Sequence, residues 1–404
     1  MAEILDRQLE LIIETPGVAV GFTIKSENII AESMVITRSL CDGNFKLGGC
    51  IASSFEIQLI DVPPNKVQGK RITVRAYETY STENVICPNA NIYPANDLYP
   101  GKYTTEKKIR YFFTGTIDTA ERQSNRQIVK VTAYDDLYIL GNKNVYTWFY
   151  NFALQSPDDV KISDLSSSLW SSQLIGLQVD GTPYGNNGND KVTLNLNALL
   201  AEKNYRGNLL AIDVLKSICE LTGVFGYISE EGNFMVVDIT DNALHPNTVV
   251  VSKYESLSFE EYETQTFDSI VLCYGDNKRY IYGRKTSYAQ ASCYYCKDNV
   301  IANCCNDSTT ARCFGSNLAY KQSGRLLYED YCYRPFTLKI DDNFVQGSIV
   351  PGCKVKIATG FSTGDVQYVN SFVLKDRITG IVNLTHEFSA EGEKVQTGYD
   401  SEAI

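Results

Sequence analysis

The stretch SLCDGNFKLGGCIASSFEIQLIDV, residues 39–62, holds two different signals in direct succession. In its second part, apolar and polar residues alternate, which predicts a strand buried on one face. The apolar positions of that strand are Phe55, Ile57 and Leu59. In its first part, Cys41 and Cys50 flank three glycines. This part leaves three interpretations open: a metal knuckle, a disulfide clip, or a turn that packs closely against another segment.

The composition is that of a folding chain. It has 404 residues, of which 44% are hydrophobic and 21% charged, so its length predicts about two to four domains. No run of about 18 apolar residues occurs, so no membrane-spanning helix is expected. The N-terminal stretch 1–17 has no basic region before its apolar residues, so we expect no signal peptide and folding in a reducing cytoplasm.

The net charge of −11 argues against a protein that grips nucleic acid, because phosphate binding requires a basic surface. An acidic wall instead suits a channel past which DNA slides. Twelve cysteines are many for such a chain. Disulfide frameworks belong mainly to small oxidised domains, so buried apolar packing is the favoured role of these cysteines.

The first third of the chain reads as β-structure. Residues 70–78 alternate, with Ile72, Val74 and Ala76 on one face. Residues 111–118 and 126–140 are predicted to form a hairpin around the polar turn 119–125. The Pro- and Asn-rich stretch 87–102 is predicted to be a long loop that makes contacts.

The middle of the chain mixes helices and strands. A helix is predicted within 156–177, from helical spacing of four apolar residues: Ile162, Leu165, Leu169 and Leu174. A second helix is predicted within 208–223, ending at Gly223, with its face formed by Leu210, Val214, Ile218 and Leu221. A β-hairpin is predicted to follow it, within 224–239. The Gly- and Asn-rich loop 180–191 lacks the spacing of a phosphate-binding loop.

The last third is Tyr- and Cys-rich at first and then returns to β-structure. Strands are predicted at 269–276 and 279–284. Residues 353–358 alternate, and 371–392 are predicted to form two strands joined near 376–380.

Catalytic patterns are scarce. His245 precedes a proline in a predicted loop, and His386 lies in the last predicted strand, opposite Leu384 and Phe388 only if that strand is bulged. Neither histidine belongs to a known hydrolase motif. The carboxylate pairs Glu260–Glu261 and Asp135–Asp136 are sequence neighbours, for which a solvated or turn role is expected.

Five cysteines cluster in the stretch 293–313: Cys293, Cys296, Cys304, Cys305 and Cys313. The Cys-x-x-Cys spacing of the first two suits tetrahedral zinc. However, a second knuckle is missing, and the adjacent Cys304 and Cys305 suit chelation poorly. Structural zinc and redox pairing after exposure to air stay open, and unbridged thiols are favoured. We assign no catalytic, cofactor-binding or metal-binding residue.

Four blocks, taken in order, resemble the hub proteins of phage tail tips, which also occur in phage-tail-like bacteriocins and form the N-terminal part of tail-associated lysins. The blocks lie at 28–62, 112–140, 207–237 and 368–393. The first resembles the family's glycine turn into a strand, and the second its F-x-G-x-I strand before V-x-A-Y-D-x-L. The third resembles its helix and hairpin, and the fourth its R-x-I-x-G-I closure. The Cys-rich stretch matches no pattern of this family.

The resemblance implies a mainly β, multi-domain hub with α+β insertions and two tail-tube-like β-barrels per subunit. Residues 1–145 would form the first barrel domain and 146–250 an α+β domain. Residues 251–345 would form a Tyr/Cys-rich β domain, and 346–404 a segment completing the second barrel. Three chains would then make a pseudo-sixfold ring.

The implied function is structural. The ring would adapt a hexameric tail tube to a threefold spike or fibre and line the DNA channel, within a virion assembled in the bacterial cytoplasm. Its partners would be the tail tube, distal tail, tape measure and spike or fibre proteins, with the host cell envelope met at infection. Because the chain ends at Ile404, we expect a bare hub that is not an enzyme. The alternatives are a cell-wall hydrolase and a carbohydrate-binding tail-tip protein, the latter suggested by 27 tyrosines.

Overall fold

A computed structural model describes most of the chain. The described residues are 3–15, 21–41, 48–84, 102–124, 127–155, 160–174, 191–192, 207–237, 249–262, 269–275, 278–283, 293–305, 334–345, 349, 351–362 and 365–391. Most of the predicted loops 87–102 and 180–191, together with His245 and Cys313, lie outside these residues. In the part that is described, no helix is long and apolar enough to span a membrane.

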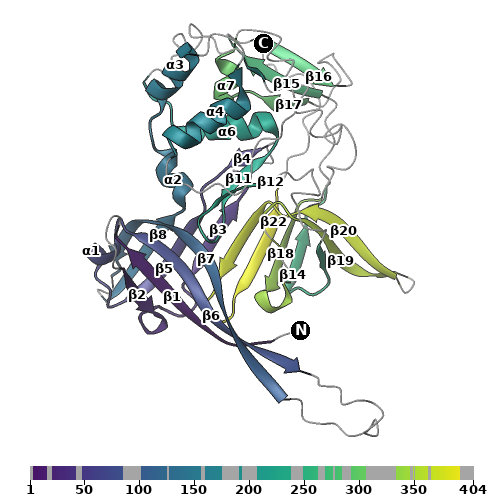
Figure 1. The fold of residues 1–404 in the computed structure, drawn as a ribbon. Coiled ribbons are helices and arrows are strands. Elements are labelled where there is room, and N and C mark those ends of the chain that lie inside the picture. Colours follow the sequence, from purple (N-terminus) through teal and green to yellow (C-terminus); the bar gives the residue numbers. More distant parts are fainter. Residues whose placement is uncertain are drawn as a thin grey trace.

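One open sheet dominates the molecule, and every adjacent strand pair in it is antiparallel (Figure 1). The strand order is β14-β18-β22-β21-β3-β5-β8-β7-β6-β1-β2. Its strands are β1 (Glu3–Glu14), β2 (Phe22–Lys25), β3 (Val35–Ser39), β5 (Ser54–Ile60), β6 (Arg71–Asn84), β7 (Lys102–Arg122), β8 (Ile128–Tyr134), β14 (Ser256–Phe259), β18 (Phe336–Asp341), β21 (Lys375–Thr379) and β22 (Thr385–Ala390). The prediction of a mainly β chain is therefore confirmed, whereas the barrels and the ring stay predictions.

The alternation read from the sequence explains how this sheet is buried. In β5 and β6, each predicted apolar position is buried and its neighbours are half-buried or exposed. Apolar residues of β21 and the turn after it, among them Ile378 and Leu384, join the same core as Leu9, Leu11 and Ile72. Strands that are far apart in the sheet order therefore share one core, so the sheet must curve strongly.

Several boundaries differ from the prediction. Strand β7 runs to Arg122, so residues 119–122 of the predicted turn 119–125 belong to the hairpin strand and pair with β8. The second hairpin strand ends at Tyr134, and the helix α2 (Asp136–Gly141) follows it, because the side chain of Asp135 accepts a hydrogen bond from the N–H of Leu137 and begins the helix. Near the C-terminus, residues 376–379 belong to β21. The turn comes after them, at Gly380, whose φ of +93° suits a residue without a side chain.

A helical lobe lies beside the sheet (Figure 1). It contains α3 (Tyr146–Gln155), α4 (Ile162–Ser172), α6 (Ala211–Thr222) and α7 (Val300–Asn303). Both predicted helices are confirmed, with Gly223 as the left-handed C-cap of α6. However, two residues predicted on helix faces lie outside the helices: Leu174 follows the end of α4, and Leu210 is the half-buried N-cap of α6. The sequence analysis did not predict α3, whose aromatic residues are weak helix formers.

Smaller sheets complete the fold. The predicted hairpin after α6 is confirmed as β11 and β12, and the predicted strands near 270 and 280 as β15 and β16. Their bounds, with those of the remaining elements, are β4 (Gly49–Cys50), β11 (Phe225–Ile228), β12 (Phe234–Val237), β15 (Ser269–Tyr274), β16 (Lys278–Gly283), β17 (Cys293–Cys296), β13 (Val249–Val251), β19 (Lys354–Ser362), β20 (Asp365–Phe372), β9 (Val160–Lys161), β10 (Lys191–Val192), α1 (Pro64–Val67), η1 (Ser26–Asn28) and η3 (Asp342–Phe344).

The segment 39–62 touches each of the other three sequence blocks. Its strand β5 pairs with β8 of the second block, and β4 pairs in parallel with β11 of the third. Just before it, β3 pairs with β21 of the fourth block. Residues 42–47 lie outside the described residues, but the parts of the segment on either side of them pack against other segments, with Cys41 and Cys50 buried. The close-packing interpretation is the one that these contacts favour.

Gly48 is the residue on which this close packing depends. Its φ is +77°, and a Cβ added there would lie 2.4 Å from the carbonyl oxygen of Cys219 in α6. That distance is far below any real carbon–oxygen contact, and the obstacle is backbone that cannot swing away. A side chain at this position therefore forces the turn and the helix apart.

We predict that Gly48→Ala lowers the free energy of unfolding by more than about 3 kcal/mol, measured from urea midpoints. Gly69→Ala is the matched control, because Gly69 has nearly the same φ, +73°, but no atom within 4 Å of the added Cβ. The control should cost only the left-handed backbone penalty, about 1–2 kcal/mol. Equal losses in the two variants would show that the turn does not pack as described.

Candidate functional site

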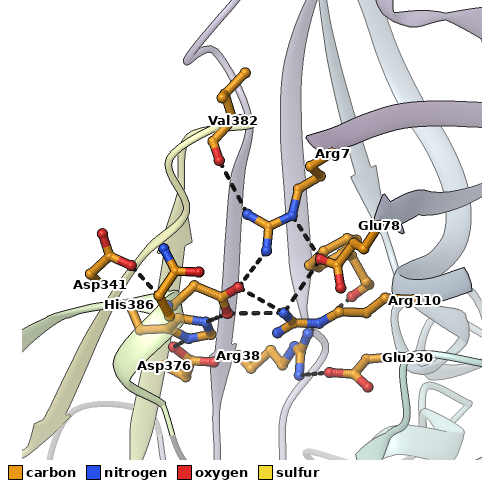
Figure 2. Close-up of polar contacts among 12 residues, drawn as sticks. Arg7, Arg38, Glu78, Arg110, Glu230, Asp341, Asp376, Val382 and His386 are labelled. Carbon is orange, nitrogen blue, oxygen red and sulfur yellow. Dashed lines mark hydrogen bonds and ion pairs between the residues drawn. The ribbon is translucent and has the colours of Figure 1, made fainter. Parts of the chain in front are cut away.

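Six charged residues meet where the two halves of the large sheet face each other (Figure 2). We call them the junction cluster. Three come from the N-terminal strands and three from the C-terminal segment: Arg7 (β1), Glu78 (β6), Arg110 (β7), Asp342 (η3), Asp376 (β21) and His386 (β22). The side chain of Arg110 is one-third exposed, and the other five are at most 4% exposed. Buried charges at this density require mutual compensation.

Asp342 is the centre of the junction cluster. Its carboxylate accepts hydrogen bonds from Arg7 Nη2 at 2.5 Å and from Arg110 Nη1 at 2.9 Å. It also lies 3.0 Å from His386 Nε2. Burial alone would raise the pKa of Asp342, but the hydrogen bond from His386 and the charges of Arg110, His386 and Arg7 outweigh it and hold this pKa well below its ordinary value. Asp342 is therefore ionised at any physiological pH.

His386 is held between two carboxylates. Its Nδ1 lies 3.1 Å from Asp376 Oδ1, and its Nε2 faces Asp342. Ionised carboxylates only accept hydrogen bonds, so both ring nitrogens must donate and the ring is an imidazolium. Burial lowers the pKa of His386, but the charge of Asp376 and the hydrogen bonds to both carboxylates raise it to about 9. Phe388, two residues on, stacks on the ring at 5.2 Å.

Glu78 completes the N-terminal side. Its carboxylate accepts hydrogen bonds from Arg7 Nε at 2.7 Å and from the hydroxyl of Tyr80. Burial and this hydrogen bond to Glu78 raise the pKa of Tyr80 to about 12, so the phenol stays protonated and donates. Arg110 lies 3.8 Å from Glu78 and stacks over the ring of Phe112. Three cations thus balance three anions, with each buried charge in contact with an opposite one.

The contacts of the junction cluster hold strands together, and they leave few of its charged groups free to act on a substrate. Strands β3, β5 and β8 separate β21 from β7 in the sheet order, so among the described strands no ladder joins the two sides of the junction cluster directly. Arg7 adds a hydrogen bond from Nη1 to the carbonyl of Val382, in the turn between β21 and β22, at 3.3 Å. The side-chain network therefore ties the N-terminal strands β1, β6 and β7 to the C-terminal strands.

A second, partly buried set of contacts joins the sheet to the hairpin that follows α6. Arg38 of β3 donates from Nη1 to Glu230 Oε1 at 2.8 Å and from Nη2 to the carbonyl of Phe112 at 3.0 Å. Glu230 lies in the turn between β11 and β12, and its carbonyl accepts a hydrogen bond from the Thr114 hydroxyl. The hairpin that follows α6 is thereby fixed to β3 and β7.

The histidine and the carboxylates considered in the sequence analysis lie in different surroundings in the structure. His386 lies on the same face as Phe388 in a regular strand, so the bulge considered for it is absent. Glu260 and Glu261 are exposed, as expected. Asp136 pairs with Arg71.

Asp135 corrects one expectation. It is 1% exposed rather than solvated, and it accepts hydrogen bonds from the N–H groups of Ser53 and Leu137. Burial raises its pKa to about 7 although these hydrogen bonds oppose the shift. Asp135 therefore anchors the start of α2 to the segment 39–62.

The cysteines of the stretch 293–313 are only partly described. Cys296, Cys304 and Cys305 are buried, and burial followed by the charge of Glu220 raises the pKa of Cys296 well above its ordinary value. Among the described residues, no group of three or more His, Cys, Asp or Glu side chains is placed to hold a metal ion. The unbridged-thiol interpretation stays a prediction.

The sequence analysis missed most of the junction cluster, although a signal was present. In residues 3–14, Arg7 occupies the inward register of Leu9 and Leu11, and Glu78 continues the inward register of Val74 and Ala76. A charged residue at an inward position of an alternating strand requires a buried partner. The partner of Arg7 on the C-terminal side, Asp342, lies 335 residues away, and no local pattern points to it.

Comparison with solved structures finds similar chains, among them two phage tail proteins. No protein-family model and no curated protein matches the chain. The tail protein from Neisseria meningitidis MC58 has a TM-score of 0.48 and 11% identity, over 95% of this chain and 96% of that one. The 43 kDa tail protein of prophage MuSo2 from Shewanella oneidensis has a TM-score of 0.47 and 9% identity, over 95% and 98%. Both TM-scores lie below 0.5, so the proposal made below rests on the residues of this chain.

We predict a stability that depends on the charge of His386. Because its pKa is raised from 6.5 to about 9, its contribution is full below pH 6.5 and is lost as the pH rises through 9. The free energy of unfolding should therefore fall by about 3 kcal/mol between pH 6.5 and 9, measured by urea titration. At the acid end, protonation of Asp342 removes its stabilisation as the pH falls below 3.8.

His386→Gln isolates this effect. It should cost about 3–5 kcal/mol at pH 6.5, because Asp342 and Asp376 lose a buried cation, and the fall between pH 6.5 and 9 should largely disappear. Lys130→Gln is the control, since it breaks an exposed ion pair with Glu56 and should cost at most about 1 kcal/mol. A His386→Gln variant that keeps the full alkaline loss would rule out His386 as its source.

Proposed function

We propose that this chain is a structural hub of a phage tail or phage-tail-like particle. In this role three copies form a ring that adapts the hexameric tail tube to a threefold spike or fibre, and DNA passes through the ring without specific binding. The partners are the tail tube, distal tail, tape measure and spike or fibre proteins, at the tip of a tail assembled in the bacterial cytoplasm.

The observation that carries the proposal is the way the four sequence blocks come together. Each block alone is a short pattern, but in the fold the segment 39–62 and the strand before it contact the other three blocks directly. A chance resemblance of four separate motifs would not require them to meet. The blocks that resemble the hub family therefore form one structural unit, which supports carrying the family's role over to this chain.

The geometry of His386 weakens the rival role of a cell-wall hydrolase. A general base must be neutral near the working pH and must reach a substrate or nucleophile. His386 is 3% exposed, both of its ring nitrogens face carboxylates, and its raised pKa keeps it charged. Both ring nitrogens of His386 are thus engaged in structural contacts and are not free to act on a substrate.

The net charge of −11 also agrees with the proposed hub role, because it suits a channel that should not bind DNA.

The oligomeric state tests this proposal. Purified protein should have the mass of three chains in solution, by light scattering or native mass spectrometry. If it is monomeric alone, it should become trimeric in assembled tails, seen as threefold density directly below the sixfold tube. A stable lone dimer, or assembled particles without the protein at the tube end, would contradict a hub role.

A further inference from the structure

The junction cluster lies between two separate apolar cores. The N-terminal core contains Leu9, Leu11 and Ile72, together with Ile378 and Leu384 from the C-terminal segment. The other, which we call the C-terminal core, is smaller, and its buried residues lie in or beside β13, β18, β19, β20 and β22. Among the described residues, no buried apolar side chain belongs to both cores.

Two stretches of chain pass from one core to the other through the junction cluster. Residues two apart in a strand share a face. On the inward face of β21, and again on that of β22, a charged residue of the cluster therefore lies between an apolar residue of one core and an apolar residue of the other. The two series are Leu374–Asp376–Ile378 and Leu384–His386–Phe388.

The remaining charged residues of the cluster stand at the same boundary. Each lies two positions from a buried apolar residue of one core: Arg7 from Leu9, Glu78 from Ala76, Arg110 from Phe112, and Asp342 from Ile340. The cluster is thus a polar layer between the two cores. Apolar contact does not depend on protonation, whereas contact through this layer depends on charge.

One proton decides whether the polar layer is satisfied. The His386 ring faces Asp342 at 3.0 Å and Asp376 at 3.1 Å, and as an imidazolium it donates to both carboxylates. A neutral imidazole has a single N–H donor. One of the two carboxylates would then face a ring nitrogen that cannot donate. Because both aspartate side chains are nearly inaccessible, the carboxylate left without its donor must gain water.

We propose that the junction cluster is a charge-dependent switch between the two cores. When His386 loses its proton, the polar layer takes up water and the C-terminal core opens, while the N-terminal core stays folded. This inference does not depend on the proposed hub role. It assigns the alkaline loss of stability predicted above to one part of the molecule.

The two sides of the layer differ in what they keep after the proton is lost. On the N-terminal side, Glu78 still accepts from Arg7 at 2.7 Å and lies 3.8 Å from Arg110. On the C-terminal side, two carboxylates remain beside a neutral ring. The C-terminal core is also the smaller one, so it has less buried apolar surface to oppose opening. Both differences place the opening on the C-terminal side.

The charged groups around His386 come from several elements (Figure 2). Asp376 of β21 and Asp342 of η3 contact the ring. The guanidinium groups of Arg7 and Arg110 lie behind Asp342, Glu78 lies beyond them, and Arg38 of β3 is the ladder partner of Asp376. Guanidinium groups stay charged throughout the pH range tested below. The pKa of His386 is raised to about 9, so this ring loses its proton within that range.

Hydrogen exchange followed by mass spectrometry tests the switch on the purified full chain. Exchange is measured at pH 6.5 and at pH 9.5, and each rate is corrected for the intrinsic rate at that pH. Protection of β18 and β19, in the C-terminal core, should fall about 100-fold between the two pH values, as the raised pKa of His386 requires. Protection of β5 and β6, in the N-terminal core, should fall less than about threefold.

His386→Gln should reproduce the open state at pH 6.5, because its amide offers one donor group and one acceptor, as a neutral imidazole does. In this variant β18 and β19 should already have lost their protection at pH 6.5 and should change little by pH 9.5. Lys130→Gln should leave both cores as in the wild type, since its ion pair is exposed. If His386→Gln does not fold, the wild-type pH comparison decides alone. Equal losses of protection in the two cores, or full protection of β18 and β19 at pH 9.5, would overturn the proposal.

Discussion

The carboxylate of Asp342 is the point on which the two halves of the large sheet depend. Two guanidinium groups and an imidazolium converge on it from β1, β7 and β22. Among the described strands no ladder pairs β21 directly with β7, because β3, β5 and β8 lie between them in the sheet order, so these side chains add a direct contact to the indirect connection through the sheet and the shared core. Buried ion clusters of this kind add less to net stability than their number suggests, since each charge loses its hydration. Each buried ion pair needs a specific distance and orientation between its groups, so these clusters favour one relative placement of the segments they join.

The segment 39–62 performs the complementary task for the helical lobe. Its glycines let backbone approach backbone at α6, and Asp135 fixes the start of α2 to it through a buried hydrogen bond with Ser53. One stretch of about 24 residues thus contacts sequence blocks that are spread over most of the chain. The strand β5 would be ordinary in isolation, and the importance of the segment comes from its contacts with the other blocks. This combination of close backbone packing and buried polar ties makes the fold sensitive to small changes there.

Local patterns predicted much of the fold. Alternation located β5 and β6, and helical spacing with a terminal glycine located α6, because these signals are set by neighbours in the chain. Where the local signal was poor, the prediction failed. The aromatic helix α3 has weak helix formers and is fixed by Phe149 and Ala153 in the core of the lobe. Asp135 looked like a turn residue, and only the fold shows that its turn is buried.

The junction cluster was beyond reach for a different reason. Arg7 and Glu78 signalled a buried charge, but the identity of their partners depends on how a curved sheet brings residue 7 to residue 342. His386 was recognised only as a histidine in a strand, and its charge state follows from two carboxylates that tertiary structure supplies. Pairing across such separations is a property of the whole topology. In a single sequence, the only sign of such pairing is a charged residue at an inward position of a strand.

A double-mutant cycle between Arg7 and Asp342 tests the central claim most directly. Arg7→Gln, Asp342→Asn and the double variant are compared by urea unfolding at pH 6.5, with the exposed pair Lys130–Glu56 as the reference cycle. If the junction cluster holds the two halves together, the two single variants should lose, in sum, about 2 kcal/mol or more of unfolding free energy beyond the loss in the double variant. For the reference pair this difference should be at most about 0.5 kcal/mol. Additive losses at Arg7 and Asp342 would mean that the halves are held by something other than these charges.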